Sequence, residues 1–232
     1  MTPDVDGNGA PTQSWRELAV ERSLDSARVR AETRVQRFID AALELVDESE
    51  TGRDFTVQEV VERSGQSLRS FYQHFGGKQE LLLALFEESV RSAVELVRQK
   101  VAAERTPRDR LRRFVVTYHE MCRPGRRGRS KRPSPTRALA ELAHQLLTTQ
   151  PAEAARAFAP LVAVFEQLLD EAVEAGVVRG DLAPRRVAGV VLEAITFDAF
   201  STAIGGLSAE ETGVDPAEEL WDLLFDGLAP RT

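Results

Sequence analysis

The chain has 232 residues, of which 42% are hydrophobic and 29% charged, and its formal net charge at pH 7 is −7. This is the composition of an ordinary folded protein with enough apolar material for a core. No apolar run approaches the roughly 18 residues that a membrane span needs, and the first thirty residues do not resemble a secretory signal. The single Cys122 cannot form an internal disulfide. We therefore expect a cytoplasmic protein that has no membrane partner.

The negative net charge argues at first against a nucleic-acid partner. Residues 1–80 hold 10 Lys and Arg against 15 Asp and Glu. Binding to phosphates, however, depends on a local basic face rather than on the total charge. From Arg63 to Gln79 the chain has three basic residues and no acidic one. DNA binding therefore stays open.

Apolar residues recur at three- and four-residue spacing along most of the chain, which predicts an all-α fold. The Gly- and Pro-containing residues 1–14 are expected to be disordered. Residues 14–24 are expected to form a short helix or turn. Asp25 or Ser26 is expected to cap the first main helix, which would run to about Asp47.

Two short helices are predicted next. Thr56 and Glu59 have the spacing of a capping box, so the first should begin there and end near Gly65. The second should run from Ser67 to Phe75, where two glycines end it. Such short helices must dock on the first main helix to bury their apolar faces. The second then projects, as the recognition helix of a helix-turn-helix does when it enters a major groove.

The second short helix separates apolar from polar side chains. Phe71 and Phe75 lie four residues apart and are expected to face the core. The remaining side chains carry donors and acceptors suited to phosphates and base edges. Those expected to face outward are Ser67, Arg69, Ser70, Gln73 and His74, with Tyr72 on the border. Lys78 adds a positive charge at the start of the next helix, where a helix N-terminus also favours anions.

The rest of the chain also reads as helical. A helix is expected to begin at Lys78 and to continue past Val101. Further helices are expected at 107–122, 137–148, 152–175 and 184–204, and from Asp215-Pro216 to about Gly227. Residues 123–136 hold three prolines and two glycines, which exclude a helix. The basic stretch 123–137 is either a solvated loop or a second contact, with the DNA backbone or with an anionic ligand.

Residues 34–90 resemble the DNA-binding domain of the TetR/AcrR family of bacterial repressors. The resemblance lies in FIDAALELV and in FTVQEVVERSGQSLRSFYQHFGGKQELLLALF. Family members show a small residue and Gly before the turn, Ser at the start of the recognition helix, and an aromatic pair followed by Phe. A Lys-containing start of the fourth helix follows. The resemblance covers more than fifty residues in order and spacing.

The resemblance implies which side chains touch DNA. Phosphate contacts carried over residue by residue are Thr56, Tyr72, His74 and Lys78, and base-edge candidates are Leu68, Arg69, Ser70 and Gln73. Two positions depart from the family pattern. Gln66 stands where an apolar residue is usual, and Leu68-Arg69 replaces a commoner pair of a basic residue and Gly. The operator preference of relatives is therefore not transferable.

The C-terminal part is rich in aromatic residues, which predicts either an apolar pocket between helices or an ordinary core. The candidate ligand-binding residues are Phe114, Tyr118, Met121, His144, Phe165 and Phe197. The family resemblance implies that a small hydrophobic effector occupies such a pocket and releases the DNA. The histidines lack the spacing of a metal site, and no nucleophile motif is present. We expect no cofactor, no metal and no catalytic residue. The alternative is a helical enzyme or small-molecule-binding domain without specific DNA binding.

Apolar stripes on the last two helices predict a homodimer built on a four-helix bundle, although an intrachain core is the alternative. Such a dimer would bind double-stranded DNA at a palindromic operator. The predicted organisation is a flexible N-terminal arm at 1–30, a helix-turn-helix domain at 31–80, and a ligand-binding and dimerisation domain at 81–232. The arginines at 28, 30 and 34 either reach DNA ahead of the first helix or pair with Glu32 and its neighbours.

Overall fold

The computed structural model describes residues 14–48, 55–122, 142, 145, 146, 148–205, 213 and 215–228. These residues form α-helices and no strand, which confirms the all-α class. The helices are α1 (Trp15–Glu48), α2 (Val57–Ser64), α3 (Leu68–His74), α4 (Lys78–Ala102), α5 (Pro107–Cys122), α7 (Pro151–Glu174), α8 (Pro184–Gly205) and α10 (Pro216–Leu228). Within the described residues, no helix is long and apolar enough to cross a membrane.

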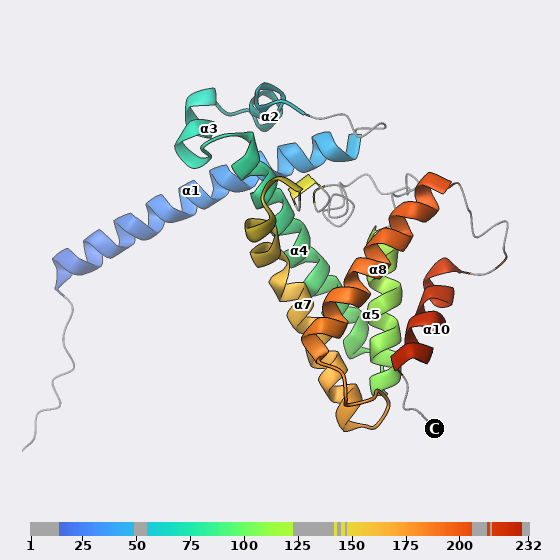
Figure 1. Ribbon diagram of the computed structural model, residues 1–232. Coiled ribbons are helices and arrows are strands. Elements are labelled where there is room, and N and C mark those ends of the chain that lie inside the picture. Colours follow the sequence, from blue (N-terminus) through green and yellow to red (C-terminus); the bar gives the residue numbers. More distant parts are fainter. Residues whose placement is uncertain are drawn as a thin grey trace, which may run out of the picture.

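The helices form a small N-terminal unit on top of a larger bundle (Figure 1). In the unit, α2 packs on α1, and α3 lies beside α2. Helix α4 begins in this unit and descends into the bundle, where it packs against α5 and α7. Helix α8 contacts α5 and α7, and α10 contacts α5. One continuous helix, α4, therefore joins the two parts, as its apolar pattern predicted.

Helix α1 is longer than the sequence pattern suggested. It is one helix of 34 residues, so the expected cap at Asp25 or Ser26 is wrong. The short helix or turn expected at 14–24 is continuous with it, and the arm expected to be flexible is helical over residues 15–30. The helix begins at Ser14, whose side-chain oxygen accepts from the Glu17 N–H (3.3 Å) while the Glu17 carboxylate accepts from the Ser14 N–H (2.9 Å). This reciprocal pair is a capping box. Residues 15–48 include neither Gly nor Pro, so no residue of that kind breaks the helix.

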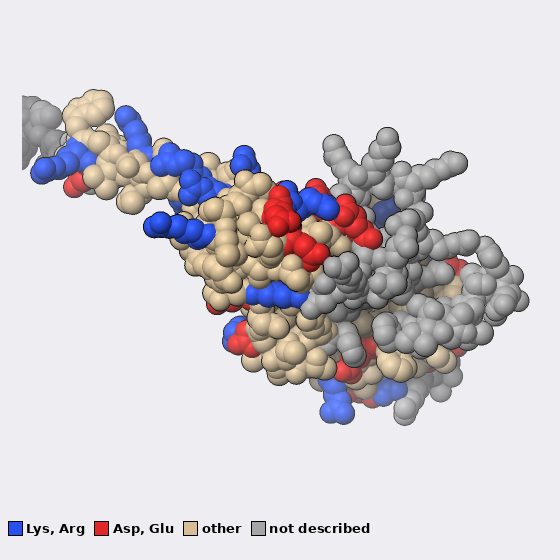
Figure 2. Space-filling model, turned by 90° about the horizontal axis from the view of Figure 1, so that it is seen from above, with Lys and Arg blue, Asp and Glu red and all other residues tan. Residues whose placement is uncertain are grey.

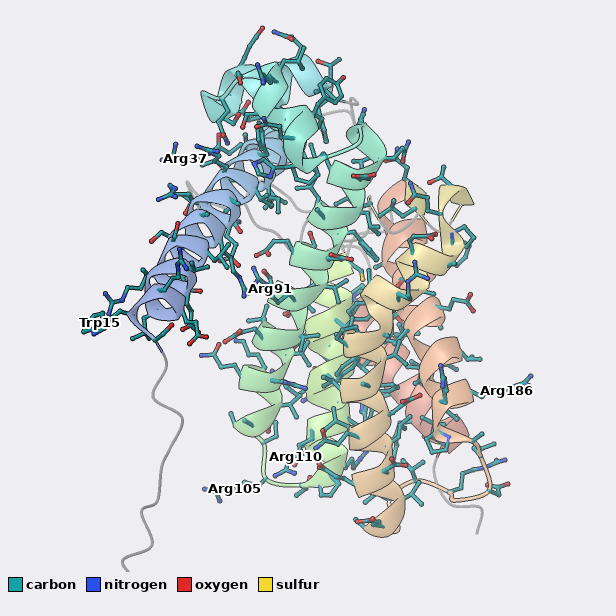
Figure 3. The ribbon with its side chains drawn as sticks, turned by 90° about the vertical axis from the view of Figure 1, so that its left-hand side faces the viewer. Trp15, Arg37, Arg91, Arg105, Arg110 and Arg186 are labelled. Atoms are coloured by element: carbon teal, nitrogen blue, oxygen red, sulfur yellow. The ribbon has the colours of Figure 1, made fainter. Side chains whose placement is uncertain are left out.

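The two halves of α1 have different surroundings. The C-terminal half is buried in the N-terminal unit through Phe38, Ile39 and Ala42. The N-terminal half projects from the rest of the chain, with Trp15 at its far end (Figures 1 and 3). Trp15 keeps 79% of its surface exposed. We call residues 15–37 the α1 stalk.

The remaining boundaries follow the sequence pattern closely. Helix α4 ends at Ala102, and α7, α8 and α10 occupy the three C-terminal segments expected to be helical. Gly65 ends α2 in the left-handed conformation (φ 65°), which L side chains rarely adopt. The basic stretch 123–137 lies outside the described residues, and so do most residues of the helix expected at 137–148.

Candidate nucleic-acid interface

Three phenylalanines hold α3 in place. The Phe38 ring on α1 lies 5.4 Å from the Phe71 ring and 6.1 Å from the Phe75 ring, measured between centroids, in edge-to-face geometry. Phe38 and Phe71 are fully buried, and Phe75 is 6% exposed. The expected inward orientation of Phe71 and Phe75 is confirmed. Aromatic pairs of this kind fix the rotation of a short helix that could not be stable alone.

Local backbone contacts set the start of α3. The Gly65 N–H donates to carbonyls at the end of α2. Ser67 is the N-cap of α3, and its side-chain oxygen accepts from the Ser70 N–H at 3.1 Å. This cap satisfies one of the free N–H groups at the helix start. The turn therefore points α3 outward while its first residues remain exposed.

The predicted DNA-contacting side chains of α3 fall into two groups. Ser67, Leu68, Arg69, Tyr72 and Gln73 are exposed, and Tyr72 keeps 58% of its surface accessible. Ser70 and His74 are half-buried. The Ser70 hydroxyl lies 3.4 Å from the Gln66 side-chain oxygen, and His74 Nε2 is buried without a hydrogen-bond partner. The first group thus forms the accessible face of α3.

Thr56 and Lys78 flank α3 at the ends of neighbouring helices. The capping box predicted at Thr56 is confirmed: its hydroxyl accepts from the Glu59 N–H (3.2 Å), and its N–H donates to the Glu59 carboxylate (2.7 Å). Thr56 is exposed. The Lys78 ammonium lies 4.9 Å from the centre of the Phe55 ring, a cation–π contact that orients the side chain at the start of α4.

Arg63, one of the three basic residues between 63 and 79, belongs to a different network. Its guanidinium forms ion pairs with Glu48 (2.8 Å) and Glu44 (3.2 Å) on α1. The hydrogen bond from Arg63 holds the pKa of Glu48 below its usual value. Arg63 therefore fastens α2 to α1, and its charge is balanced within the protein.

Gln66, the residue that departs from the family pattern, links α1 to the start of α3. Its side-chain N–H donates to the Arg34 carbonyl oxygen at 2.9 Å. An apolar residue at this position could not make that bond. The departure from the family pattern is visible in the sequence, but this contact is not, because Arg34 is 32 residues away in the chain.

The candidate ligand-binding residues lie in the core of the bundle, with one exception. Phe114, Tyr118, Met121 and Phe165 are buried, and the Phe114 and Phe165 rings are 4.5 Å apart. The Tyr118 hydroxyl lies 2.9 Å from the Thr196 hydroxyl on α8, and burial raises the pKa of this phenol. Phe197 is 73% exposed, so the structure does not bring it into this cluster. His144 lies outside the described residues.

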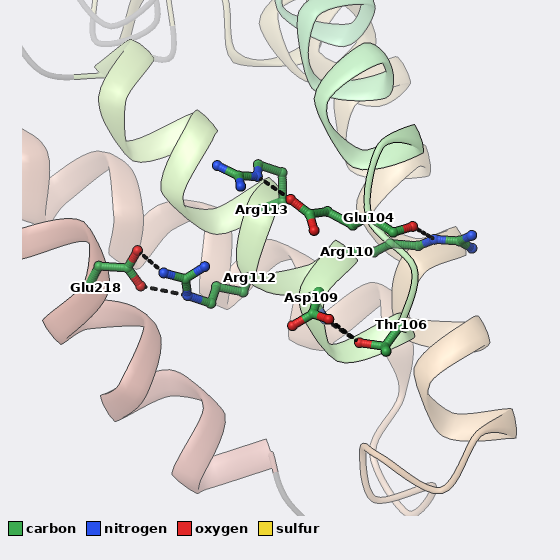
Figure 4. Close-up of polar contacts among 7 residues, drawn as sticks. All are labelled: Glu104, Thr106, Asp109, Arg110, Arg112, Arg113 and Glu218. Carbon is green, nitrogen blue, oxygen red and sulfur yellow. Dashed lines mark hydrogen bonds and ion pairs between the residues drawn. The ribbon is translucent and has the colours of Figure 1, made fainter.

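Other polar contacts of the bundle join neighbouring elements. Figure 4 shows two ion pairs of α5: Arg112 with Glu218 on α10, and Arg113 with Glu104 (2.7 Å). Burial raises the pKa of the Cys122 thiol to about 11, so it stays protonated and unreactive at neutral pH. No group of His, Cys, Asp or Glu among the described residues is arranged to hold a metal ion.

An apolar groove of about 330 Å³ lies between α8 and α10. Its lining includes Val187, Val190, Val191, Leu223 and Leu224. Val190 and Leu223 remain 58% and 73% exposed, respectively.

Comparison with known proteins agrees with this geometry. Residues 38–85 match the model of bacterial regulatory proteins of the tetR family. No sequence among curated proteins matches the chain. The fatty acid degradation regulator FadR from Bacillus halodurans has a TM-score of 0.62 and 18% identity, over 85% of this chain and 97% of its own.

Two further solved structures share the fold. FadR from Bacillus subtilis, in complex with stearoyl-CoA, has a TM-score of 0.58 and 16% identity, over 83% of this chain and 98% of its own. The ketosteroid regulator KstR2 of Mycobacterium tuberculosis has a TM-score of 0.53 and 18% identity, over 85% of this chain and 96% of its own. The whole described architecture, and not only the N-terminal unit, is thus similar to that of transcriptional regulators.

Proposed function

We propose that the chain is a TetR-family transcriptional regulator and acts as a homodimeric repressor that a small hydrophobic effector releases from a palindromic operator. The observation that carries the proposal is the geometry of α3. Buried Phe71 fixes this helix, while Arg69, Tyr72 and Gln73 extend from its exposed face. A rigid helix with exposed hydrogen-bonding side chains is what major-groove recognition requires.

We assign base reading to the exposed face of α3. Arg69 suits the two acceptors of guanine, Gln73 suits adenine, and the exposed Leu68 suits a thymine methyl group. Half-buried Ser70 is a weaker candidate because its hydroxyl faces Gln66. The assigned phosphate contacts are Thr56, Ser67, Tyr72 and Lys78, and half-buried His74 is a weaker candidate because its Nε2 is buried. We assign DNA binding to residues 31–80 and the effector and dimer functions to residues 81–232.

We assign the partner subunit to the apolar groove between α8 and α10. The exposed Val190, Phe197 and Leu223 would be covered there. Helices from two subunits would form a four-helix bundle related by a two-fold axis. Such a dimer presents two copies of α3, so its operator should be palindromic, with half-sites about 34–36 Å apart or at a multiple of that spacing. The site of action is the bacterial cytoplasm, where the DNA lies.

We place the effector among the buried aromatic side chains of α5 and α7. Phe114, Tyr118 and Phe165 are close-packed here, so a ligand must open this cluster or bind a second arrangement of the helices. FadR from Bacillus subtilis was solved with stearoyl-CoA, which carries a long apolar chain. An apolar effector of this general kind fits the aromatic composition of the cluster.

Two contacts would carry the effect of the ligand to α3. Helix α4 runs from the N-terminal unit into the bundle, where its Phe86 ring stacks on Phe158 of α7 at 6.3 Å. The Gln150 amide at the start of α7 lies 3.5 Å from the Gln79 amide oxygen at the start of α4. A shift of α7 would therefore move the end of α4 that carries the recognition unit.

The test has two stages. Genomic footprinting of the purified protein should return a palindrome. Calorimetric titration of stearoyl-CoA into free and operator-bound protein should then give weaker binding to the complex, because coupling between two sites is reciprocal. Light scattering should show that the dimer persists. Equal affinities in the two titrations would exclude stearoyl-CoA as an effector that releases the operator. If footprinting returned no selected sequence, that result would favour the alternative of a helical small-molecule-binding domain or enzyme.

A further inference from the structure

The projecting stalk of α1 separates its charges onto two faces. Arg16, Arg30 and Arg37 are spaced by multiples of seven residues, so they lie along one side of the helix, and Arg34 is one turn from Arg30. The acidic residues lie on the other side. Arg16 and Asp25 are nine residues apart, and so are Glu21 and Arg30. Nine residues make two and a half helical turns, so the two residues of each pair lie on opposite sides of the helix. We call the first side the basic stripe.

The arginines of the basic stripe are exposed and available. Arg16, Arg30, Arg34 and Arg37 are all exposed, and among the described residues none of them forms an ion pair with a carboxylate. Arg28 behaves differently. It lies toward the acidic side, where its guanidinium pairs with Glu32 at 2.8 Å. The stalk thus keeps four of its unpaired arginines on one face, and a fifth exposed arginine, Arg22, lies beside that face.

Basic side chains of the α1 stalk lie on the side of the molecule that carries the recognition helix. Figure 2 views the molecule from the side of α2 and α3, and basic side chains are gathered along the projecting part of α1 in this view. Arg37 lies at the end of the stalk nearest to α3 (Figure 3). The hydrogen bond from Gln66 to the Arg34 carbonyl fixes the stalk against the start of α3.

We propose that the α1 stalk is a second DNA contact, which binds the phosphate backbone outside the half-site assigned to α3. This inference rests on the proposed DNA binding. At 1.5 Å per residue, Arg16 lies about 32 Å along the helix from Arg37. With one phosphate per 3.4 Å on each strand, that length corresponds to about nine base pairs. The stripe lengthens the contacted duplex without reading its sequence, because arginine–phosphate contacts carry no base information.

This contact also accounts for a DNA-binding protein with a net charge of −7. The N-terminal unit need not be positive overall when four unpaired arginines form one exposed line. Phosphate contacts raise affinity for all sequences and make binding steeply dependent on salt. The stalk therefore supplies general DNA affinity, while α3 supplies the choice of site.

The test compares the full-length protein with a variant carrying Arg16→Gln, Arg30→Gln, Arg34→Gln and Arg37→Gln. Gln keeps the length and helix propensity of the side chains, and circular dichroism checks the fold. The probe is a duplex of about 40 base pairs of arbitrary sequence, titrated at several salt concentrations. We expect affinity to fall at least about tenfold and the salt slope to become shallower by about 0.9 for each lost contact.

Arg28→Gln is the matched control, because it removes one positive charge from the same stalk on the side of Glu32. It should leave the salt slope unchanged, because Arg28 lies off the basic stripe and makes no proposed phosphate contact. Equal slopes for the wild type and the fourfold variant would overturn the proposal. A changed assembly mass with unchanged DNA binding would also overturn it and assign the stalk to a protein interface. If the fourfold variant misfolds, Arg16→Gln with Arg30→Gln, both in the projecting half, gives the same test.

This experiment is separate from the test of the proposed function. A chain that selects no operator fails as a sequence-specific regulator, yet it would still show the difference on arbitrary duplex. Conversely, a chain that selects a palindrome with unchanged salt slopes keeps its proposed function and loses the stalk contact.

Discussion

The N-terminal unit and the helical bundle differ in how their arginines are placed. Four arginines of the bundle pair with carboxylates of the same chain: Arg110 with Glu171, Arg112 with Glu218, Arg113 with Glu104, and Arg179 with Asp181. In the N-terminal unit, Arg63 is held by two glutamates, but the arginines of the basic stripe form no such pairs among the described residues. The comparison teaches that net charge is a poor guide to DNA binding. What matters is which charges the fold leaves unpaired.

The largest expected effect concerns the core of the N-terminal unit. Phe71→Ala should destabilise that unit by about 3–5 kcal/mol, because it removes a fully buried ring and leaves a cavity. Since α3 depends on this ring for its position, DNA binding should be lost at the same time. Hydrogen exchange of the α3 amides and DNA affinity are the measurements.

Phe165→Ala is the matched control, because it removes a buried phenylalanine ring from the bundle instead of the N-terminal unit. It should lower bundle stability by a similar amount while exchange protection in α3 persists. If α3 stays protected in the Phe71→Ala protein, the phenylalanine cluster does not hold the recognition helix.

The second expected effect is on operator preference, and it should differ between an arginine without a carboxylate partner and one that is paired. Arg69→Ala should cost about 1–3 kcal/mol at one operator base pair and relax the preference there. Arg63→Gln should leave the selected sequence unchanged, because its guanidinium lies against Glu44 and Glu48. Selection from randomised duplexes measures both. An unaltered motif with Arg69→Ala would exclude this residue from base reading.

The smallest effect concerns an ion pair of the bundle. Arg112 and Glu218 are both partly exposed, so a double-mutant cycle of Arg112→Gln and Glu218→Gln should give a coupling of about 0–1 kcal/mol. DNA binding should not change. A coupling well above this range would mean that α10 depends on the pair for its docking on α5.

Local signals in the sequence were sufficient for most of the fold and for the position of α3. The Thr56 capping box, Gly65 and the Phe71–Phe75 spacing each act within a few residues, so the sequence displays them directly. Pairings across the chain were not predictable. Nothing near Arg63 indicates that its partners lie on α1, and nothing near Gln66 indicates a bond to the Arg34 carbonyl.

The sequence was misleading where a residue has two common roles. Asp25 and Ser26 are favourable caps, but here they lie inside a helix that Ser14 and Glu17 have already started. Phe197 is aromatic and lies in an apolar segment, yet it is exposed on α8. Only the packing of neighbouring helices decides whether such a side chain faces the core or a partner.

The capping box at Ser14 has a consequence for how this protein can vary. Local hydrogen bonds start α1, and little tertiary packing constrains its first two turns. Insertions or deletions there can change the reach of the helix without disturbing the fold. Seven added residues would lengthen it by about 10 Å and keep the arginine register almost unchanged. A longer or shorter stalk would thus contact a different length of flanking duplex, through changes in a segment that folding stability scarcely restricts.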